Sequence, residues 1–480
     1  MLLNIIKNKV FTYLITRYMT YLVQFISSII IATKLGPYYF GVWGFILLLI
    51  NYLRIIDFGI SSATNILLVQ NKDNPQKSSN YVTNSLFLIS ILGVFISLLA
   101  GYYHFFGIKL FDKYQVKTLF YPVCLVAIIT HFNVLFMNLY RVKNSLFPIS
   151  FFQSVVPILM LFFIFFSEGE TLIWFLITSY LIGNIASLAI FIWGGKNPPL
   201  GKINMSDSKQ IVTKGIYLFI HTISFYLIVV SIKTLVSIYY SVEEFGIFTF
   251  SYTLSNSVLL FLQAMSFVIF PKVIDRLKNK DVVAVRALIN ELRINYVTLA
   301  FGLIFIFISI VPLLLNFFPK YKEASISLGL LSLTLVLYTN SFGYGSYLMA
   351  QDKEKINALI SFVSLLINII IGVILITVFH VSYKYVVVAT IFAYVIYTYL
   401  SVYFGKKNMS LKEGFIKNFN DCFPLRLLIP YLVAIVLILF NQKVFFSFSF
   451  FVYLVLNRNE IKIIFTRIKQ TIDKPNVVNL

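Results

Sequence analysis

Long apolar runs recur from one end of this chain to the other. Each run is long enough to cross the roughly 30 Å of hydrocarbon in a bilayer, which takes about 20 helical residues. The pattern predicts twelve transmembrane helices, at 10–34, 40–68, 81–105, 118–140, 147–167, 171–194, 215–240, 245–271, 294–318, 325–350, 356–380 and 384–405. Two weaker apolar segments follow, near 425–440 and 443–457.

The two halves of the pattern resemble each other. Phe40-Gly41 opens the second predicted span, and Phe245-Gly246 opens the eighth, 205 residues later. Six spans per half is an even number, so both halves enter the bilayer in the same sense. Repeats of this kind are related by an axis along the membrane normal, with the substrate site between them. The predicted fold is therefore an all-α polytopic membrane protein with two six-helix bundles related by a pseudo-two-fold along the membrane normal, followed by a C-terminal pair of short membrane segments.

The predicted domains follow from this repeat. An N-terminal six-helix bundle occupies 1–194, a cytoplasmic linker 195–214 and a C-terminal six-helix bundle 215–405. Residues 406–480 hold a loop, the helix pair at about 425–457 and a basic cytoplasmic tail.

Composition and charge narrow the class of protein. The chain is 59% hydrophobic and 12% charged, which excludes an ordinary soluble domain. Its net charge of +21 does not indicate a nucleic-acid partner, because the basic residues are distributed by topology. With the N-terminus inside, cytoplasmic loops and tails carry 28 of the 39 Lys and Arg residues and external loops carry 8. This positive-inside bias predicts cytoplasmic N- and C-termini, and the basic loops favour contact with anionic membrane lipids.

No motif for catalysis or for a cofactor is present. Cys124 and Cys422 fall too far apart in the predicted topology to form a disulfide, and no metal-ligand spacing appears. The chain also lacks a phosphate-binding glycine loop and a nucleophile–base arrangement. We therefore expect a non-enzymatic transporter without a cofactor, driven by an ion gradient, by the membrane potential or by downstream consumption of its cargo.

Three cations interrupt the apolar spans: Arg17, Arg54 and Lys233. Each costs about 2.5 to 3.5 kcal/mol at the bilayer centre on the translocon-derived scale. Asp57 is the one carboxylate within the predicted spans. This excess of buried positive charge indicates an anionic cargo.

Each of these charges has a second interpretation. Arg54 and Asp57 are three residues apart and share a helical face, so they either form an ion pair or leave Arg54 facing a hydrated cavity, where Asp57 orients it or titrates during transport. Arg17 and Lys233 each lie about 10 Å from a helix end, so each either snorkels to that surface or faces the same cavity. In the second case the three cations form a staggered series, with Arg17 low, Arg54 central and Lys233 high.

Two histidines lie well inside predicted spans, away from the span ends. His131 in the fourth span and His221 in the seventh are either proton carriers or packed, hydrogen-bonded side chains.

Two motifs in the first half carry a resemblance to a known family. They are Lys34-Leu35-Gly36-Pro37-x-x-Phe40-Gly41 and Arg54-x-x-Asp57-Phe58-Gly59-Ile60, matched in the second half by Glu244-Phe245-Gly246-Ile247-Phe248. Their order and spacing, with the number of spans, resemble the polysaccharide flippases (O-antigen transporters) of the multidrug/oligosaccharidyl-lipid/polysaccharide exporter superfamily. The resemblance covers roughly residues 5–405, and the C-terminal pair departs from the simplest twelve-span pattern.

The resemblance implies a flippase in the bacterial cytoplasmic (inner) membrane that serves O-antigen, lipopolysaccharide or related polysaccharide biosynthesis. Its substrate would be a polyprenyl-pyrophosphate-linked oligosaccharide, moved from the cytoplasmic to the outer leaflet by alternating access. Arg54, Arg17 and Lys233 match the cationic cavity that would hold the diphosphate head, and Asp57 would orient or couple. A coupling ion, H⁺ or Na⁺, and contact with a glycan polymerase complete the expected partners.

Two other functions are weighed against this one. An ion-coupled exporter of drugs or organic cations from the same superfamily would favour carboxylates in its cavity, whereas only Asp57 is available here. A non-transporting membrane scaffold of a glycan-assembly complex would not need buried charges in both halves.

Overall fold

The computed structural model describes residues 9–71, 73–143, 145–195, 197, 199–278, 281–443 and 446–473. Within these ranges the chain is helical and divides into two compact units. Unit 1 comprises residues 1–223 and 240–246, and unit 2 comprises residues 224–239 and 247–480. The expected all-helical, multi-pass fold is confirmed.

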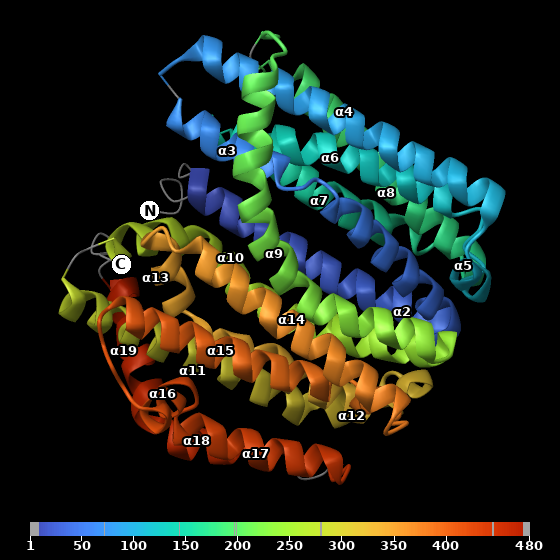
Figure 1. Ribbon diagram of the computed structural model, residues 1–480. Helices are drawn as coiled ribbons and strands as arrows, with labels where there is room; N and C mark the ends of the chain where they lie inside the picture. The colour runs from blue at the N-terminus through green and yellow to red at the C-terminus, as the bar shows by residue number, and fades with distance from the viewer. Residues whose placement is uncertain are drawn as a thin grey trace. The chain divides into compact units, whose positions relative to one another are not determined.

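Unit 1 is built around one central helix. It contains α2 (Lys9–Ile55), α3 (Ile60–Gln70), α4 (Pro75–Phe106), α5 (Lys109–Tyr114), α6 (Phe120–Val142), α7 (Leu146–Phe163), α8 (Gly169–Trp193) and the first part of α9 (Met205–Tyr239). α6 contacts α2, α3, α4, α7 and α8 (Figure 1). This position buries polar side chains of α6, among them His131, Asn133 and Asn138. α9 begins inside the stretch that the sequence analysis assigned to a linker.

Unit 2 contains the rest of α9 and of α10 (Val242–Leu277), then α11 (Val282–Asn316), η1 (Pro319–Tyr321), α12 (Ala324–Leu337), η2 (Tyr338–Ser341), α13 (Tyr344–Ala350), α14 (Glu354–Thr377), η3 (Tyr383–Tyr385), α15 (Val388–Asn408), α16 (Phe415–Cys422), α17 (Leu425–Leu439), α18 (Phe446–Leu456) and α19 (Arg458–Asp473). The segment Ala324–Ser341 is the innermost of its helices, because 89% of its apolar window is buried. It packs against α11, α15 and α17. The two weak C-terminal segments of the sequence form α17 and α18.

The helices do not correspond one to one with the predicted spans. Ten helices within the described residues are long and apolar enough to cross a membrane, and an eleventh if the bent pair α16–α17 is one span. One of them, α2, contains the first predicted span and residues 40–55 of the second, separated by a non-helical kink at Gly36 (φ 66°, ψ 175°). The tenth predicted span is divided among α12, η2 and α13, with Gly343 at φ 91° between the last two. The eighth predicted span coincides with α10, although the side chains of 261–272 lie outside the described part of the chain.

Candidate functional site

The second predicted span is not a continuous helix. α2 ends at Ile55 and α3 begins at Ile60, and the residues between them form turns. Phe58 has φ 47° and Gly59 has φ 76°, which are left-handed conformations that a helix does not contain. The Asp57 carboxylate accepts a hydrogen bond from the Gly59 amide at 2.9 Å. Asp57 therefore stabilises the break instead of projecting from the same helical face as Arg54.

Glycine is required at position 59 for two reasons. Its positive φ is unfavourable for a residue with a Cβ atom. A Cβ atom there would also overlap the carbonyl oxygen of Gly215 on α9. The ring of Phe58 lies beside that of Phe219 on the same helix, with their centroids 5.4 Å apart. The break is thus held against α9 by close backbone contact.

Two side chains of α6 bind backbone carbonyls on either side of the break. The His131 Nε2 atom lies 3.0 Å from the carbonyl oxygen of Leu53, and the Asn138 Nδ2 atom donates to the carbonyl of Ser61 at 3.1 Å. The carbonyl of Leu53 can only accept, so Nε2 of His131 carries the proton. His131 and Asn138 are seven residues apart, two turns along one face of α6. Of the two histidines well inside predicted spans, His131 is packed and hydrogen-bonded, and the side chain of His221 lies outside the described part of the chain.

Arg54 is exposed at the end of α2 and forms no ion pair with Asp57. Neither residue belongs to any of the ion pairs within 4.0 Å among the described residues. Of the two interpretations left open by the sequence, the ion pair is absent in this structure. The physical reason is the break, which turns Asp57 toward the amide of Gly59.

The kink at Gly36 folds α2 back along α6. Tyr13, near the start of α2, belongs to the same buried cluster as Tyr140 of α6. Leu53, near the end of α2, accepts from His131 of α6. The two positions on α6 are separated by about 14 Å of helix, whereas a straight helix from Tyr13 to Leu53 would cover about 60 Å.

This fold-back places Arg17 and Arg54 in the same part of unit 1. Arg17 lies one turn after Tyr13, and Arg54 directly follows Leu53. The guanidinium of Arg17 lies 4.4 Å from the centre of the Tyr21 ring, a cation–π contact that leaves its N–H donors free to bind an anion.

Lys233 belongs to unit 2, on α9, and is 6% exposed. Its Nζ atom lies 4.7 Å from the centre of the Tyr252 ring on α10. No ion pair within 4.0 Å joins it to a described carboxylate. On the same helix, the carbonyl of Ile228 and the hydroxyl of Ser231 accept from Asn368 of α14, at 2.6 and 2.9 Å. An ammonium group stabilised by one aromatic ring has capacity for an anionic ligand.

The two Phe-Gly motifs of the repeat pack against each other within unit 1. A Cβ atom on Gly41 would overlap the carbonyl oxygen of Val242, and one on Gly246 would overlap the carbonyl oxygen of Pro37. The start of α10 is further fixed by Ser241, whose backbone amide donates to the Glu244 carboxylate at 2.9 Å in a capping box. The repeated glycines thus have a reciprocal packing role.

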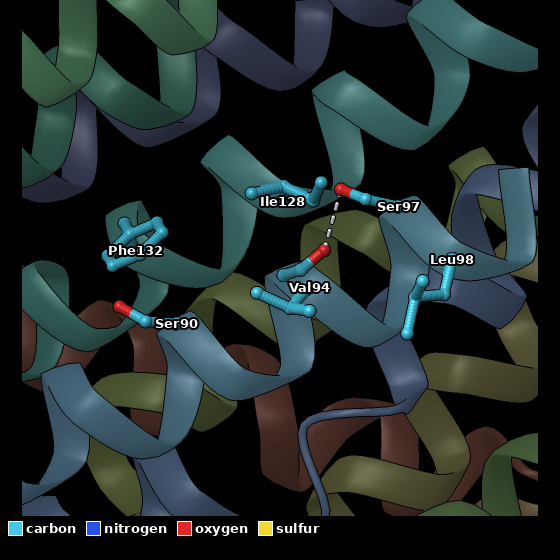
Figure 2. A pocket seen from close by; sticks show the side chains of 7 residues that line it. Ser90, Val94, Ser97, Leu98, Ile128 and Phe132 are labelled. Atoms are coloured by element: carbon cyan, nitrogen blue, oxygen red, sulfur yellow. Dashed lines mark hydrogen bonds between the residues drawn. The ribbon is translucent and has the colours of Figure 1, made fainter. Parts of the chain in front are cut away.

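A groove between α4 and α6 lies elsewhere in unit 1 and has a volume of about 420 Å³. Figure 2 shows its lining side chains, which come from α4 and α6: Ser90, Val94, Ser97, Leu98, Ile128 and Phe132. The hydroxyl of Ser97 donates to the carbonyl of Gly93 in its own helix. None of the predicted site residues lines this groove, so it does not locate the cationic site.

Comparison with solved structures identifies the fold. The chain is similar to the lipid II flippase MurJ in an inward closed conformation, with a TM-score of 0.73 and 13% identity over 95% of this chain and 99% of that one. It is also similar to an inward-facing multidrug resistance MATE family transporter of the MOP superfamily, with a TM-score of 0.64 and 12% identity over 83% and 98% of the two chains. A MOP superfamily transporter from Pyrococcus furiosus gives a TM-score of 0.58 and 12% identity over 84% and 95%.

Comparison of sequences identifies the family. No curated protein sequence matches the chain. The family model described as polysaccharide biosynthesis protein matches residues 6–277, which is more than half of the chain. The matched region contains the broken second span and all four predicted site residues. This chain belongs to the polysaccharide biosynthesis protein family, and it has the fold of the MOP superfamily transporters.

Proposed function

We propose that this protein is a flippase for a polyprenyl-pyrophosphate-linked oligosaccharide repeat unit of O-antigen or a related surface polysaccharide. It moves this lipid from the cytoplasmic to the outer leaflet of the bacterial inner membrane by alternating access, with both termini in the cytoplasm. The proposal rests on the family to which the chain belongs and on the cations of its predicted spans, which form no ion pair among the described residues. Coupling to H⁺ or Na⁺, and contact with a glycan polymerase, belong to the same proposal.

The observation that carries the proposal is that the cations in the predicted spans form no ion pair with an acidic residue in the described part of the chain. Arg54 is exposed and is not paired with Asp57, and Lys233 is buried against an aromatic ring. A diphosphate presents several oxygen acceptors, which suit the planar fork of an arginine and the point charge of a lysine. Arg54 and Arg17 in unit 1, and Lys233 in unit 2, are each proposed to bind the anionic head of the substrate.

The positive charge of these residues argues against export of organic cations. Such a cargo would need a free carboxylate in the membrane interior. Asp57 is engaged with the amide of Gly59, where it fixes the end of the broken span. Its proposed role is therefore to orient the segment that carries Arg54.

Depletion of the protein in its native host tests the function directly. Lipid-linked repeat units should accumulate on the cytoplasmic leaflet while surface polysaccharide falls. Protection of the accumulated oligosaccharide from an impermeant glycosidase, added to intact spheroplasts, measures the leaflet. Unchanged surface polysaccharide, or lipid-linked units that are accessible from outside, would contradict the proposal.

A further inference from the structure

The end of unit 2 that carries α16 has a geometry suited to a membrane surface. α16 and α17 are bent by 68° relative to each other, across a break of two residues. If α17 crosses the bilayer, α16 must lie at a steep angle to that direction, close to the membrane plane. The start of α19 lies at the same end, because Arg426 of α17 bonds Asn457 at 2.8 Å and pairs with Glu460 at 3.4 Å.

α16 presents apolar side chains outward although it follows a polar loop. Phe415 is 66% exposed and Ile416 is 75% exposed, whereas Asn418 and Cys422 of the same helix are buried. α19 has the same character within its described residues, because Phe465 is 68% exposed. Large apolar side chains at a polar helix end are typical of helices that lie in the membrane interface.

The acidic and basic residues around these side chains differ in exposure. The acidic residues of this region face inward: Glu413 accepts from Lys406 at 2.5 Å and from Arg286 at 3.0 Å, and Asp421 also accepts from Lys406. Glu460 is paired with Arg426.

The exposed charges of the described residues 406–422 and 457–466 are basic: Lys407, Lys412, Lys417, Arg458 and Lys462. The outer layer of this end is therefore cationic and apolar together. An anionic bilayer surface matches both of these properties.

We propose that α16 and the start of α19 form an interfacial surface that binds the anionic phospholipid head groups of the bilayer. Lys407 and Lys412 contact the head groups, and Phe415 and Ile416 enter the boundary of the acyl chains. The ion pairs of Lys406 and Glu413 hold α16 in this orientation. The proposal does not depend on the transported substrate.

The test uses the full chain in nanodiscs of phosphatidylcholine alone and of phosphatidylcholine mixed with phosphatidylglycerol. Amide hydrogen exchange of residues 412–422 should be slower in the anionic discs. In the double variant Lys407→Gln/Lys412→Gln, this protection from exchange in the anionic discs should fall roughly tenfold. Addition of 1 M salt should have the same effect on the wild type. Ile416→Ser should reduce protection in both lipids.

The matched control is Lys320→Gln/Lys322→Gln, which removes two exposed lysines outside this surface and should leave the exchange unchanged. Equal protection in the two kinds of disc, or no effect of the double variant, would overturn the proposal. Protection that requires two copies per disc would instead assign this surface to self-association, and would also overturn it. Native circular dichroism of each variant shows that it is folded.

Discussion

Arg54 is the residue on which the proposed function depends most directly. It sits one residue before the end of α2, beside a break whose carbonyls are bound by His131 and Asn138. These contacts fix the backbone on either side of the break without a salt bridge between Arg54 and Asp57. The guanidinium of Arg54 forms no ion pair within the described part of the chain, so its five N–H donors can bind a ligand.

Replacing Arg54 tests this assignment. Arg54→Ala should reduce transport of the lipid-linked oligosaccharide by roughly 10- to 100-fold, since a hydrogen bond to a charged group contributes about 1.5 to 3 kcal/mol. Arg54→Lys should retain part of the activity because the charge remains. Transport is measured by surface polysaccharide in a complemented depletion strain.

The control for Arg54 is Arg141→Ala, an exposed arginine at the end of α6. It should leave transport near the wild-type level. Wild-type transport by Arg54→Ala, with normal insertion of the protein, would remove Arg54 from the site. By the same electrostatic argument, Arg17→Lys and Lys233→Arg should be tolerated better than removal of either charge.

At the scale of elements, α16 is joined to α15 and α11 by one charged cluster. Lys406 of α15 is almost fully buried, and Glu413 accepts from it and from Arg286 of α11. Burial raises the pKa of Glu413, but hydrogen bonds from Lys406 and Lys417 outweigh this and lower the pKa from 4.5 to about 2. A carboxylate with a lowered pKa stabilises the folded state above its unfolded pKa, and that stability is lost as the pH falls toward the folded value.

Glu413 should therefore make unit 2 sensitive to acid between pH 4.5 and pH 2. Glu413→Gln should destabilise the protein by about 3 kcal/mol at pH 7, because a buried lysine loses one of its acidic partners. The difference from wild type should shrink as the pH falls through this window, where protonated Glu413 becomes similar to glutamine. Thermal unfolding in detergent as a function of pH measures it.

Glu323→Gln provides the comparison for this experiment. Glu323 pairs with Lys384 at 3.3 Å, but its side chain is 71% exposed. Removing an exposed pair should cost less than about 1 kcal/mol at every pH. If the difference in stability between Glu413→Gln and wild type is constant from pH 7 to pH 2, the carboxylate charge does not stabilise the cluster.

At the scale of the whole molecule, the proposed direction of transport requires a defined orientation in the membrane. The excess of Lys and Arg in alternate loops predicts that the loop after α15 is cytoplasmic and that the loop after α11 is external. Cys124 and Cys422 are both buried, so native thiols give little background to labelling.

Labelling of single introduced cysteines tests this orientation. Lys320→Cys should react with a membrane-impermeant maleimide in intact cells, and Lys412→Cys should react only after permeabilisation. Both positions are exposed in the structure, so reactivity reports sidedness rather than burial. Labelling of Lys412→Cys in intact cells would reverse the topology and, with it, the direction proposed for transport.

The sequence predicted the helices well and their interruptions poorly. Six of the twelve predicted spans agree with α4, α6, α7, α8, α14 and α15 within a few residues at one or both ends. Hydropathy locates such helices because an apolar run of bilayer length has few alternatives. It does not register a break such as that at Asp57 and Gly59, since a polar side chain that bonds a nearby amide does not change the average hydropathy of the span.

The sequence pattern also did not predict the buried hydrogen bonds and ion pairs. His131 and Asn138 are spaced for one face of a helix, but their partners are backbone carbonyls almost 80 residues away. Lys406 was assigned to a basic loop, whereas its acidic partners follow it by 7 and 15 residues. Only the i,i+4 pair of Glu413 and Lys417 follows from local spacing.

The sequence identified an all-helical membrane protein with an excess of cations in its spans, because hydrophobic length and charge are properties of composition along the chain. The tertiary structure decided what surrounds those cations. It folded α2 back at Gly36, so that Arg17 and Arg54 came to one part of α6, and it turned Asp57 away from Arg54. Backbone dihedral angles and contacts between distant residues produce these arrangements, and neither is encoded in the local periodicity of apolar positions.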